Sequence, residues 1–243
     1  MYILCANQSR RFTSGPFSIR RIFPGQSIPS LQDNALGPLS VIDHANLATG
    51  TVVAMHEHVN DEILSYMWRG SMVHEDSAGH RTSLSSKKLM MMNAGKSFWH
   101  EESTPAEPAE MLQIFIRPRE ADLEGHVQFM DRPDGIVHDD WTLLAGPAGS
   151  NAPLTIRQDV YVSDIMLSHG SRTTPPCVSG MAGWLYIMDG GLAVGEQRLV
   201  KGDALAVSDG ALPEVVATEN SLLICFQVRL DAPAIMDGTI SGR

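Results

Sequence analysis

The sequence predicts an all-β fold made of two β-sandwich or β-barrel units. Short apolar runs recur along the 243-residue chain and are broken by Gly, Pro, Asn, Asp and Ser at intervals that suit a strand followed by a turn. Sustained helical periodicity is hard to find anywhere in the sequence. The strand pattern is interrupted once by a polar stretch and then resumes. Antiparallel sandwiches or barrels are the architecture that such a pattern favours.

The first half contains seven predicted strands, over residues 38–42, 51–58, 62–69, 71–75, 88–93, 98–102 and 111–117. Asp76-Ser77-Ala78-Gly79 predicts a hairpin turn after the fourth strand, since glycine accepts a positive φ at little cost. The run Met90-Met91-Met92 could suggest copper binding. Consecutive strand residues alternate faces and cannot all reach one ion, so we expect these methionines to fill the core.

A polar stretch over residues 118–140, rich in Asp and Glu and containing two prolines, is interpreted as the connection between two units. Strands are predicted after it over residues 154–162, 165–168, 183–189, 192–194, 203–208, 214–218 and 222–228. Two successive all-β halves of comparable length indicate an internal structural duplication. We therefore expect domains at residues 1–130 and 131–243.

Charge and composition exclude several function classes. Lys and Arg total 18 against 28 Asp and Glu, a formal charge of −10 that repels phosphate backbones and anionic lipid, so direct nucleic-acid binding is not expected. No apolar run approaches the roughly 20 residues of a spanning helix, and the first residues do not form a signal peptide, so we expect a cytoplasmic protein. The three cysteines are scattered and predict neither a disulfide framework nor a thiolate metal site.

The histidines form the sharpest pattern in the chain, because five of the nine lie between positions 56 and 100. Gly50-x5-His56-Glu57-His58 is followed downstream by His100-Glu101-Glu102. Residues i and i+2 of a strand share a face, so His56 projects with His58, and His100 projects with Glu102. Two such strands meeting inside a barrel would bring together three imidazoles and one carboxylate. These groups are suitable ligands for Fe, Mn, Co, Ni, Cu or Zn.

The same alternation predicts the walls of the site. Val52 and Ala54 should share the face of the first histidine pair, and Phe98 that of the second, which gives the site apolar walls. The outward-facing residues would be Met55, Glu57, Trp99 and Glu101. A bulge in either strand would reverse these assignments beyond it.

Simpler interpretations remain for the neighbouring polar residues. An isolated His-x-His is more often a surface or hydrogen-bonded pair than a metal site, and Glu101-Glu102 could be a solvated loop. His74 and His80 flank the hairpin turn and are expected to be structural or exposed. Glu62 is either an acid that hydrogen-bonds to the metal ligands or only the first residue of a strand.

These motifs carry a family resemblance. Gly50-x5-His-x-His is similar to the first cupin motif. More specifically, His56-x-His58-x3-Glu62, the segment Gly70-Ser71-Met72-x-His74-Glu75-Asp76-x2-Gly79-His80, and Ala94-Gly95-x4-His100-x-Glu102 resemble the pirin family over most of residues 17–117. The second half shows a weaker likeness, at Gly202-Asp203, and repeats no metal motif. Pirins are bicupins, two jelly-roll-like barrels, so the resemblance implies a metal-binding N-terminal cupin domain and a degenerate C-terminal one.

Carried over to this chain, the family's metal ligands fall on His56, His58, His100 and Glu102. The implied cofactor is one divalent transition metal ion, with iron favoured over Ni, Mn, Co, Cu and Zn. Pirin-like proteins with intact ligands are linked to flavonol (quercetin-type) 2,3-dioxygenase activity. The resemblance therefore implies a small aromatic substrate, dioxygen as co-substrate, and Glu102 as the catalytic general base. One departure is Glu57, where pirins usually have proline.

Two other functions fit the same motifs. Family members in animal nuclei resemble redox-responsive transcription cofactors, which would use the same four ligands to alter a surface for protein partners. A cupin isomerase or sugar-modifying enzyme is a weaker third option, because few extra polar groups lie at pocket positions. Phe98, Gln113 and Phe115 would either line a substrate cavity or belong to the ordinary barrel core.

Overall fold

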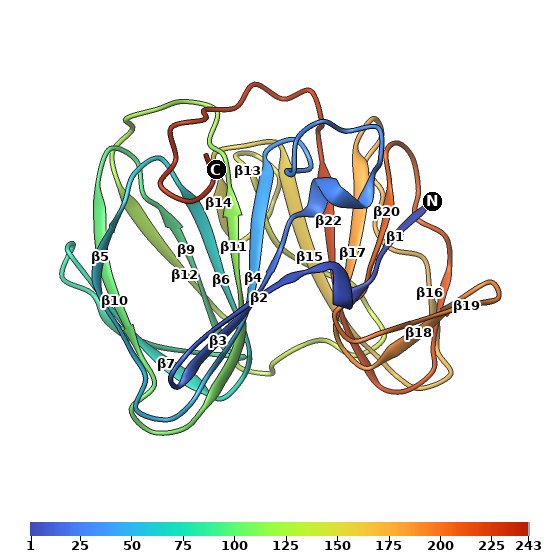
Figure 1. Cartoon of the computed structure of the whole chain (residues 1–243), viewed down its shortest axis with the longest axis horizontal. Coiled ribbons are helices and arrows are strands. Elements are labelled where there is room, and N and C mark those ends of the chain that lie inside the picture. The colour runs from blue at the N-terminus through green and yellow to red at the C-terminus, as the bar shows by residue number, and fades with distance from the viewer. Residues whose placement is uncertain (243) are drawn as a thin grey trace.

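The computed structural model describes residues 1–242 and consists almost entirely of β-strands, which confirms the predicted fold class. Two curled β-barrels lie side by side, and their long central strands face each other (Figure 1). The helices in the described part are two short 3-10 turns, η1 (Ala6–Gln8) and η2 (Pro24–Ser27). None of the described helices is long and apolar enough to cross a membrane.

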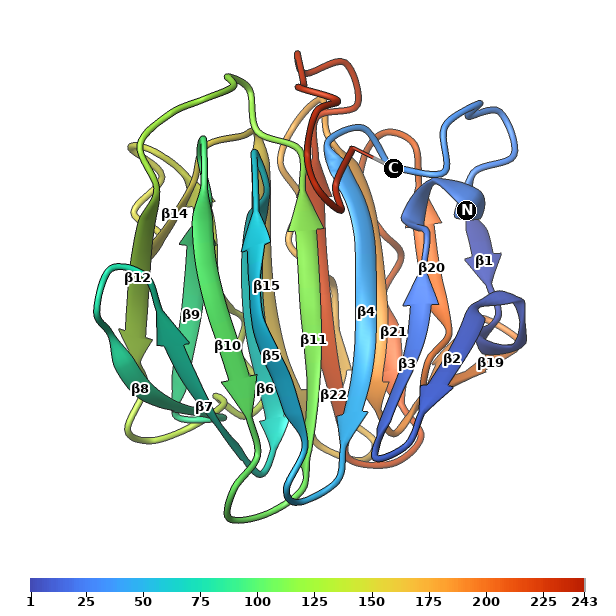
Figure 2. The same ribbon diagram turned by 60° about the vertical axis from the view of Figure 1, so that its left-hand side comes forward.

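The first barrel is one continuous sheet of eleven strands, shown from its outer side in Figure 2. In spatial order they are β2 (Arg10–Ser14), β3 (Phe17–Ile22), β4 (Leu39–Leu47), β11 (Ala109–Ile116), β6 (Glu62–Arg69), β9 (Lys88–Asn93), β8 (Arg81–Ser85), β7 (Ser71–Asp76), β10 (Phe98–Ser103) and β5 (Val52–His58), with β12 (His126–Asp131) paired to β9. The β7–β8 connection is the predicted turn, and Gly79 has a φ of 93° there.

The second barrel is made of two sheets. The larger contains β1 (Tyr2–Leu4), β20 (Ala204–Val207), β17 (Ala182–Asp189), β22 (Ser221–Val228), β15 (Val160–Leu167), β13 (Thr142–Pro147) and β14 (Leu154–Ile156). The smaller contains β16 (Arg172–Thr173), β21 (Val215–Ala217), β18 (Gly191–Val194) and β19 (Gln197–Val200).

Among residues 1–242, the buried apolar side chains form three clusters: one inside each barrel and one between the two facing sheets. Strand alternation divides the side chains among them. On β11, Met111 and Phe115 belong to the interior of the first barrel, whereas Leu112 and Ile114 belong to the layer between the barrels. The central strands are buried on both faces, which explains why their sequences are continuous apolar runs.

The three consecutive methionines of β9 follow the same rule. Met90 and Met92 lie inside the first barrel, and Met91 lies between the barrels. All three side chains are fully buried. They fill the core and do not converge on one point, as expected; the structure adds that they belong to two different clusters.

The structure corrects the interpretation of residues 118–140 as only a connection. Strand β12 lies within this stretch and pairs with β9 along its whole length, from His126 opposite Asn93 to Asp131 opposite Lys88. Only one of its apolar side chains, Val127, is buried, so the stretch lacks a strong strand signal. The predicted strand 154–162 is also divided in two, since β14 ends at Ile156 and β15 begins at Val160.

Each end of the described chain crosses to the other barrel. Strand β1 pairs with β20, with Tyr2 opposite Ala206. In the opposite direction, the last described residues run over the top of the molecule and reach the first barrel (Figure 1). There the backbone N–H of Thr239 donates to the carbonyl oxygen of Val59 at 3.0 Å.

Candidate metal centre

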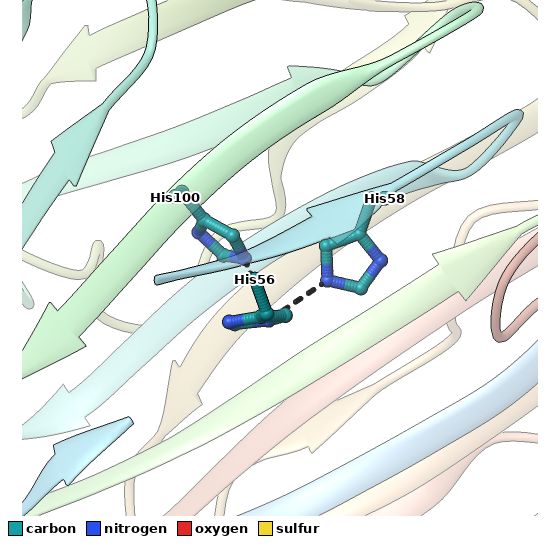
Figure 3. A group of neighbouring side chains, drawn as sticks. All are labelled: His56, His58 and His100. Carbon is teal, nitrogen blue, oxygen red and sulfur yellow. Dashed lines mark hydrogen bonds between the residues drawn. The ribbon is translucent and has the colours of Figure 1, made fainter. Parts of the chain in front are cut away.

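Strands β5 and β10 bring the two predicted histidine motifs together inside the first barrel. The strands are antiparallel, and their register places His100 opposite His56 and Phe98 opposite His58. His56 and His58 share one face of β5 because they are two residues apart. The three imidazole rings therefore converge, as Figure 3 shows.

The geometry of the three rings fits a shared metal ion. The Nε2 atom of His56 lies 3.1 Å from Nε2 of His58 and 3.1 Å from Nε2 of His100. The ring centroids are 4.5 to 5.1 Å apart. Each imidazole N–H can donate to only one neighbouring nitrogen. Three Nε2 atoms that face one point therefore keep lone pairs that can bind a cation.

The other ring nitrogens fix the tautomers that metal binding needs. Nδ1 of His56 donates to the carbonyl oxygen of Ala54 at 2.9 Å, and Nδ1 of His58 donates to Oδ2 of Asp61 at 2.8 Å. A hydrogen at Nδ1 leaves Nε2 with its lone pair, which is the arrangement typical of metal-ligating histidines. Nδ1 of His100 is buried and has no hydrogen-bond partner.

Burial favours the neutral imidazole form of His56 and His100 by lowering the pKa of each. Burial, together with the neighbouring His56, His58 and His74, lowers the pKa of His100 to about 2. Burial also lowers the pKa of His56, and the bond from Nδ1 to the Ala54 carbonyl only partly opposes this. Neutral imidazole is the form that ligates metals, so the site is prepared for a cation.

The predicted fourth ligand, Glu102, lies on the other side of His100. Its Oε1 is 3.9 Å from Nδ1 of His100, and the amide nitrogen of Gln113 donates to both of its carboxylate oxygens at 2.9 and 2.8 Å. His74, His100 and Glu102 form a second buried group whose ligand atoms all lie within 4.8 Å of one another. Burial raises the pKa of Glu102 to about 7, although the Gln113 hydrogen bond acts to lower it.

The predicted apolar walls on β5 are wrong. Val52 is 60% exposed and Ala54 is also exposed, while Val53 packs against the interior of the first barrel. The cause is a β-bulge, because the register jumps from His100 opposite His56 to Glu102 opposite Val53. One extra residue on β5 reverses the alternation beyond it.

The aromatic positions agree better with the predictions. Phe98 is buried inside the first barrel, as expected, and the Phe115 ring centroid lies 6.0 Å from that of His58. Met55 and Trp99 are exposed, at 47% and 43%. The apolar side of the site is thus formed by β10 and β11.

Two groups of polar residues lie behind the histidines: sequence reasoning missed Asp61, whereas His74 and His80 were expected to be structural or exposed, as the structure shows. Asp61 is fully buried and accepts a hydrogen bond from His58; an acid three residues after a candidate ligand is the signal that could have identified it. His74 is fully buried, and its Nε2 is hydrogen-bonded to Asp76 at 2.9 Å. Asp76 in turn pairs with His80, whose side chain is 43% exposed.

Glu62 has a structural role away from the three histidines. It begins β6, is buried, and accepts hydrogen bonds from the Asn93 amide at 2.6 Å and from the backbone N–H of Arg157 at 2.9 Å. Burial raises its pKa to about 7. Because Arg157 belongs to the second half of the chain, Glu62 helps to join the two barrels.

Two family models match the chain in succession. Residues 17–116 match the pirin model, and residues 143–228 match the model of the quercetinase C-terminal cupin domain. Among curated proteins, the quercetin 2,3-dioxygenase of Escherichia coli K12 is 23% identical over 192 residues, 78% of this chain and 82% of that protein. A pirin-like protein of Caulobacter vibrioides is 28% identical over 194 residues, 77% of this chain and 82% of that protein.

Solved structures show the same fold. The bacterial pirin YhhW of Escherichia coli, solved in complex with nickel(II), matches with a TM-score of 0.80 at 22% identity, over 96% of this chain and 99% of that one. A quercetin 2,3-dioxygenase of Acinetobacter baumannii matches with a TM-score of 0.76 at 20% identity, over 95% of this chain and 87% of that one. With matched models over both barrels and the bicupin architecture in place, the chain belongs to the pirin family.

Proposed function

We propose that this protein is a metal-dependent dioxygenase that opens the ring of a flavonol, or of a similar hydroxylated aromatic compound, with dioxygen. The observation that carries the proposal is the convergence of the Nε2 atoms of His56, His58 and His100 inside the first barrel. The relatives named as quercetin 2,3-dioxygenases supply the substrate class.

The three histidines would hold one divalent first-row metal, with Glu102 as a further ligand or as a base beside it. When bound, such an ion supplies Lewis-acid and redox chemistry towards the substrate oxygen and dioxygen. A nitrogen-rich set without thiolate differs from the usual structural zinc site, which favours cysteine ligands. The site therefore suits catalysis better than structural support.

Glu102 is the group that would take the proton from the substrate hydroxyl. A general base works best when its pKa lies near the operating pH, and burial raises the pKa of Glu102 to about 7. Gln113 orients the carboxylate by donating to both oxygens. In the ionised form, one of these oxygens would accept the phenolic proton as the ring becomes electron-rich.

Phe98 and Phe115 would exclude water from the reacting centre. Both side chains are buried in the interior of the first barrel, and the ring of Phe115 lies beside that of His58. An apolar wall of this kind strengthens the electrostatic interactions of Glu102 with a bound phenol. It also favours a flat aromatic substrate over a sugar.

The test is aerobic turnover of a flavonol by protein loaded in turn with Fe(II), Ni(II), Mn(II) and Co(II). We expect oxygen uptake and stoichiometric release of carbon monoxide with at least one metal. His56→Ala should abolish both, and Glu102→Gln should lower the turnover rate by about 100-fold or more while metal stays bound. Metal-loaded protein that releases no carbon monoxide with any of these ions would favour the non-enzymatic, redox-responsive alternative.

A further inference from the structure

Asp61 connects the candidate metal centre to the far end of the described chain. Its side chain is fully buried, between the end of β5 and the start of β6. Oδ2 accepts a hydrogen bond from Nδ1 of His58 at 2.8 Å. The other oxygen, Oδ1, accepts from both the backbone N–H and the hydroxyl of Ser241, at 2.9 and 2.7 Å. One carboxylate thus joins a candidate ligand to a residue 180 positions later.

Residues 239–241, here called the clamp, are fixed to the first barrel on several sides. Thr239 pairs with Val59, accepting from its backbone N–H at 2.8 Å and donating its own N–H at 3.0 Å. The carbonyl oxygen of Ser241 accepts from the Ser40 hydroxyl at 2.6 Å and from Nε of Arg117 at 2.9 Å. Ser241 is fully buried. The clamp is therefore part of the first barrel although it follows the second (Figure 1).

Only a carboxylate satisfies both sides of this arrangement. His58 and Ser241 both present hydrogen donors, so position 61 needs two accepting oxygens. An asparagine would turn its NH2 group either towards the imidazole or towards the Ser241 donors, and either choice places donors face to face. The backbone N–H of Ile240 also donates to both oxygens, at 3.3 and 3.2 Å, so the clamp fixes the carboxylate with Oδ2 facing His58.

We propose that the clamp positions His58 for metal binding, through Asp61. With Oδ1 held by Ser241, Oδ2 fixes the hydrogen of His58 on Nδ1, and Nε2 keeps its lone pair directed at His56 and His100. Asp61 and Ser241 are positioning residues, since neither belongs to the three-histidine group. The inference rests on the proposed function only in taking His58 as a metal ligand.

A glycine beside the clamp provides a way to displace it. A Cβ atom at Gly238 would lie 2.6 Å from Oδ1 of Asp61 and 2.9 Å from the carbonyl oxygen of Asn60, and would press against the Ser241 hydroxyl. These distances are too short for a carbon atom, so Gly238→Ala should push the clamp away from Asp61. The variant leaves His58 and Asp61 themselves unchanged.

The experiment compares the full-length protein with Asp61→Asn, Ser241→Ala and Gly238→Ala. The matched control is Ser221→Ala, because Ser221 is equally buried and its hydroxyl bonds to Gly191 and Glu219 in the second barrel. The dissociation constant for Ni(II) is measured by chelator competition. We expect binding about 10- to 100-fold weaker in Asp61→Asn, a smaller loss in the two clamp variants, and none in Ser221→Ala.

A second readout follows the imidazole directly, without metal. The ring-nitrogen NMR shifts of His58, recorded above the usual imidazole pKa of about 6.5, should show hydrogen on Nδ1 alone in the wild type and a mixture of tautomers in the variants. In return, bound Ni(II) should slow amide hydrogen exchange at Ser241, because coupling between two sites is reciprocal.

The outcomes separate the clamp from the proposed function. The proposed role of the clamp is supported if Ni(II) binds more weakly to the three variants but not to Ser221→Ala, and if His58 shows mixed tautomers in the variants. Unchanged His58 tautomers in the variants would overturn this role. An equal loss of Ni(II) affinity in Ser221→Ala would also overturn it, because that loss would indicate general destabilisation. If the wild type binds no metal, the proposed function fails, and the NMR shifts alone then decide whether the clamp positions His58.

Discussion

The two barrels have similar architecture but different contents. Inside the first, five methionines and two phenylalanines surround a cluster of histidines. Inside the second, the buried cluster consists of Ile, Leu, Val, Ala and a single cysteine. A buried imidazole or carboxylate costs free energy unless it is hydrogen-bonded or ligated, so a polar site needs supporting residues. The first barrel supplies them through the Ala54 carbonyl, Asp61 and Gln113.

The same fold therefore does not by itself specify a polar site. Both barrels pair long antiparallel strands around an interior, yet the polar supports for the histidines are confined to the first. The second barrel contributes an apolar layer between the barrels, and the segment that follows it provides, through residues 239–241, the contacts to Asp61. Among the described residues, both groups of side chains that could hold a metal ion lie in the first barrel.

The largest expected effect follows from removing one of the three converging imidazoles. His100→Ala deletes a fully buried ring whose Nε2 lies 3.1 Å from that of His56. We expect the metal content, measured by elemental analysis after loading and dialysis, to fall by about tenfold or more. Cys225→Ala removes the sulfur from the interior of the second barrel and should leave the metal content unchanged. Equal metal content in wild type and His100→Ala would contradict the contrast between the barrels.

The next largest expected effect is the loss of stability caused by creating a cavity in the second barrel. Leu223 is fully buried in its aliphatic interior, so Leu223→Ala should lower the free energy of unfolding by about 2–5 kcal/mol. Urea denaturation measures this loss. The shared layer between the barrels should make them unfold together in one transition. Two separate transitions, with only one displaced, would show that the barrels are energetically independent.

A smaller effect on stability is expected from removing the charge of Glu110, which joins the two barrels. Glu110 on β11 binds Nε2 of His44 at 2.8 Å and Nζ of Lys201, from the second barrel, at 2.5 Å. Burial alone would raise the pKa of Glu110, but the hydrogen bonds from His44 and Lys201 outweigh it and lower the pKa to about 2. A lowered pKa means that the stabilisation is complete above the unfolded pKa of about 4.5 and is lost as the pH falls towards 2.

Glu110→Gln tests this contribution. The difference in unfolding free energy between wild type and variant should be on the order of 2 kcal/mol near neutral pH and should shrink as the pH falls below about 4. Urea titrations at several pH values measure this difference. The contributions of the other acidic groups are the same in both proteins and cancel. A difference that stays constant down to low pH would show that the charge of Glu110 does not join the barrels.

The local patterns were visible in the sequence. The His-x-His spacing placed His56 and His58 on one face, and the apolar runs located most of the central strands. Alternation also predicted correctly that the three methionines of β9 fill the core instead of meeting at one ion. These features depend on residues within one strand, where a period of two is enough to assign a face.

Features that depend on pairing were not visible. The bulge that exposes Val52 and Ala54 is a property of two strands together, so neither strand alone reveals it. The bonds from Asp61 to Ser241 join residues 180 positions apart. Strand β12 has too few buried apolar residues for its own sequence to signal a strand, and its pairing with β9 defines it.

The smallest expected effect concerns how the first barrel is filled. Methionine is unbranched and flexible, so it can follow the irregular space beside the histidine rings. Met92→Leu in the first barrel and the reverse exchange Leu185→Met in the second conserve volume, and each should cost less than about 1.5 kcal/mol. Urea denaturation measures both, and neither should change the metal content. A loss of about 3 kcal/mol or more for Met92→Leu alone would show that the methionines around the site are shaped to fit it, and that the two interiors differ in packing precision as well as in polarity.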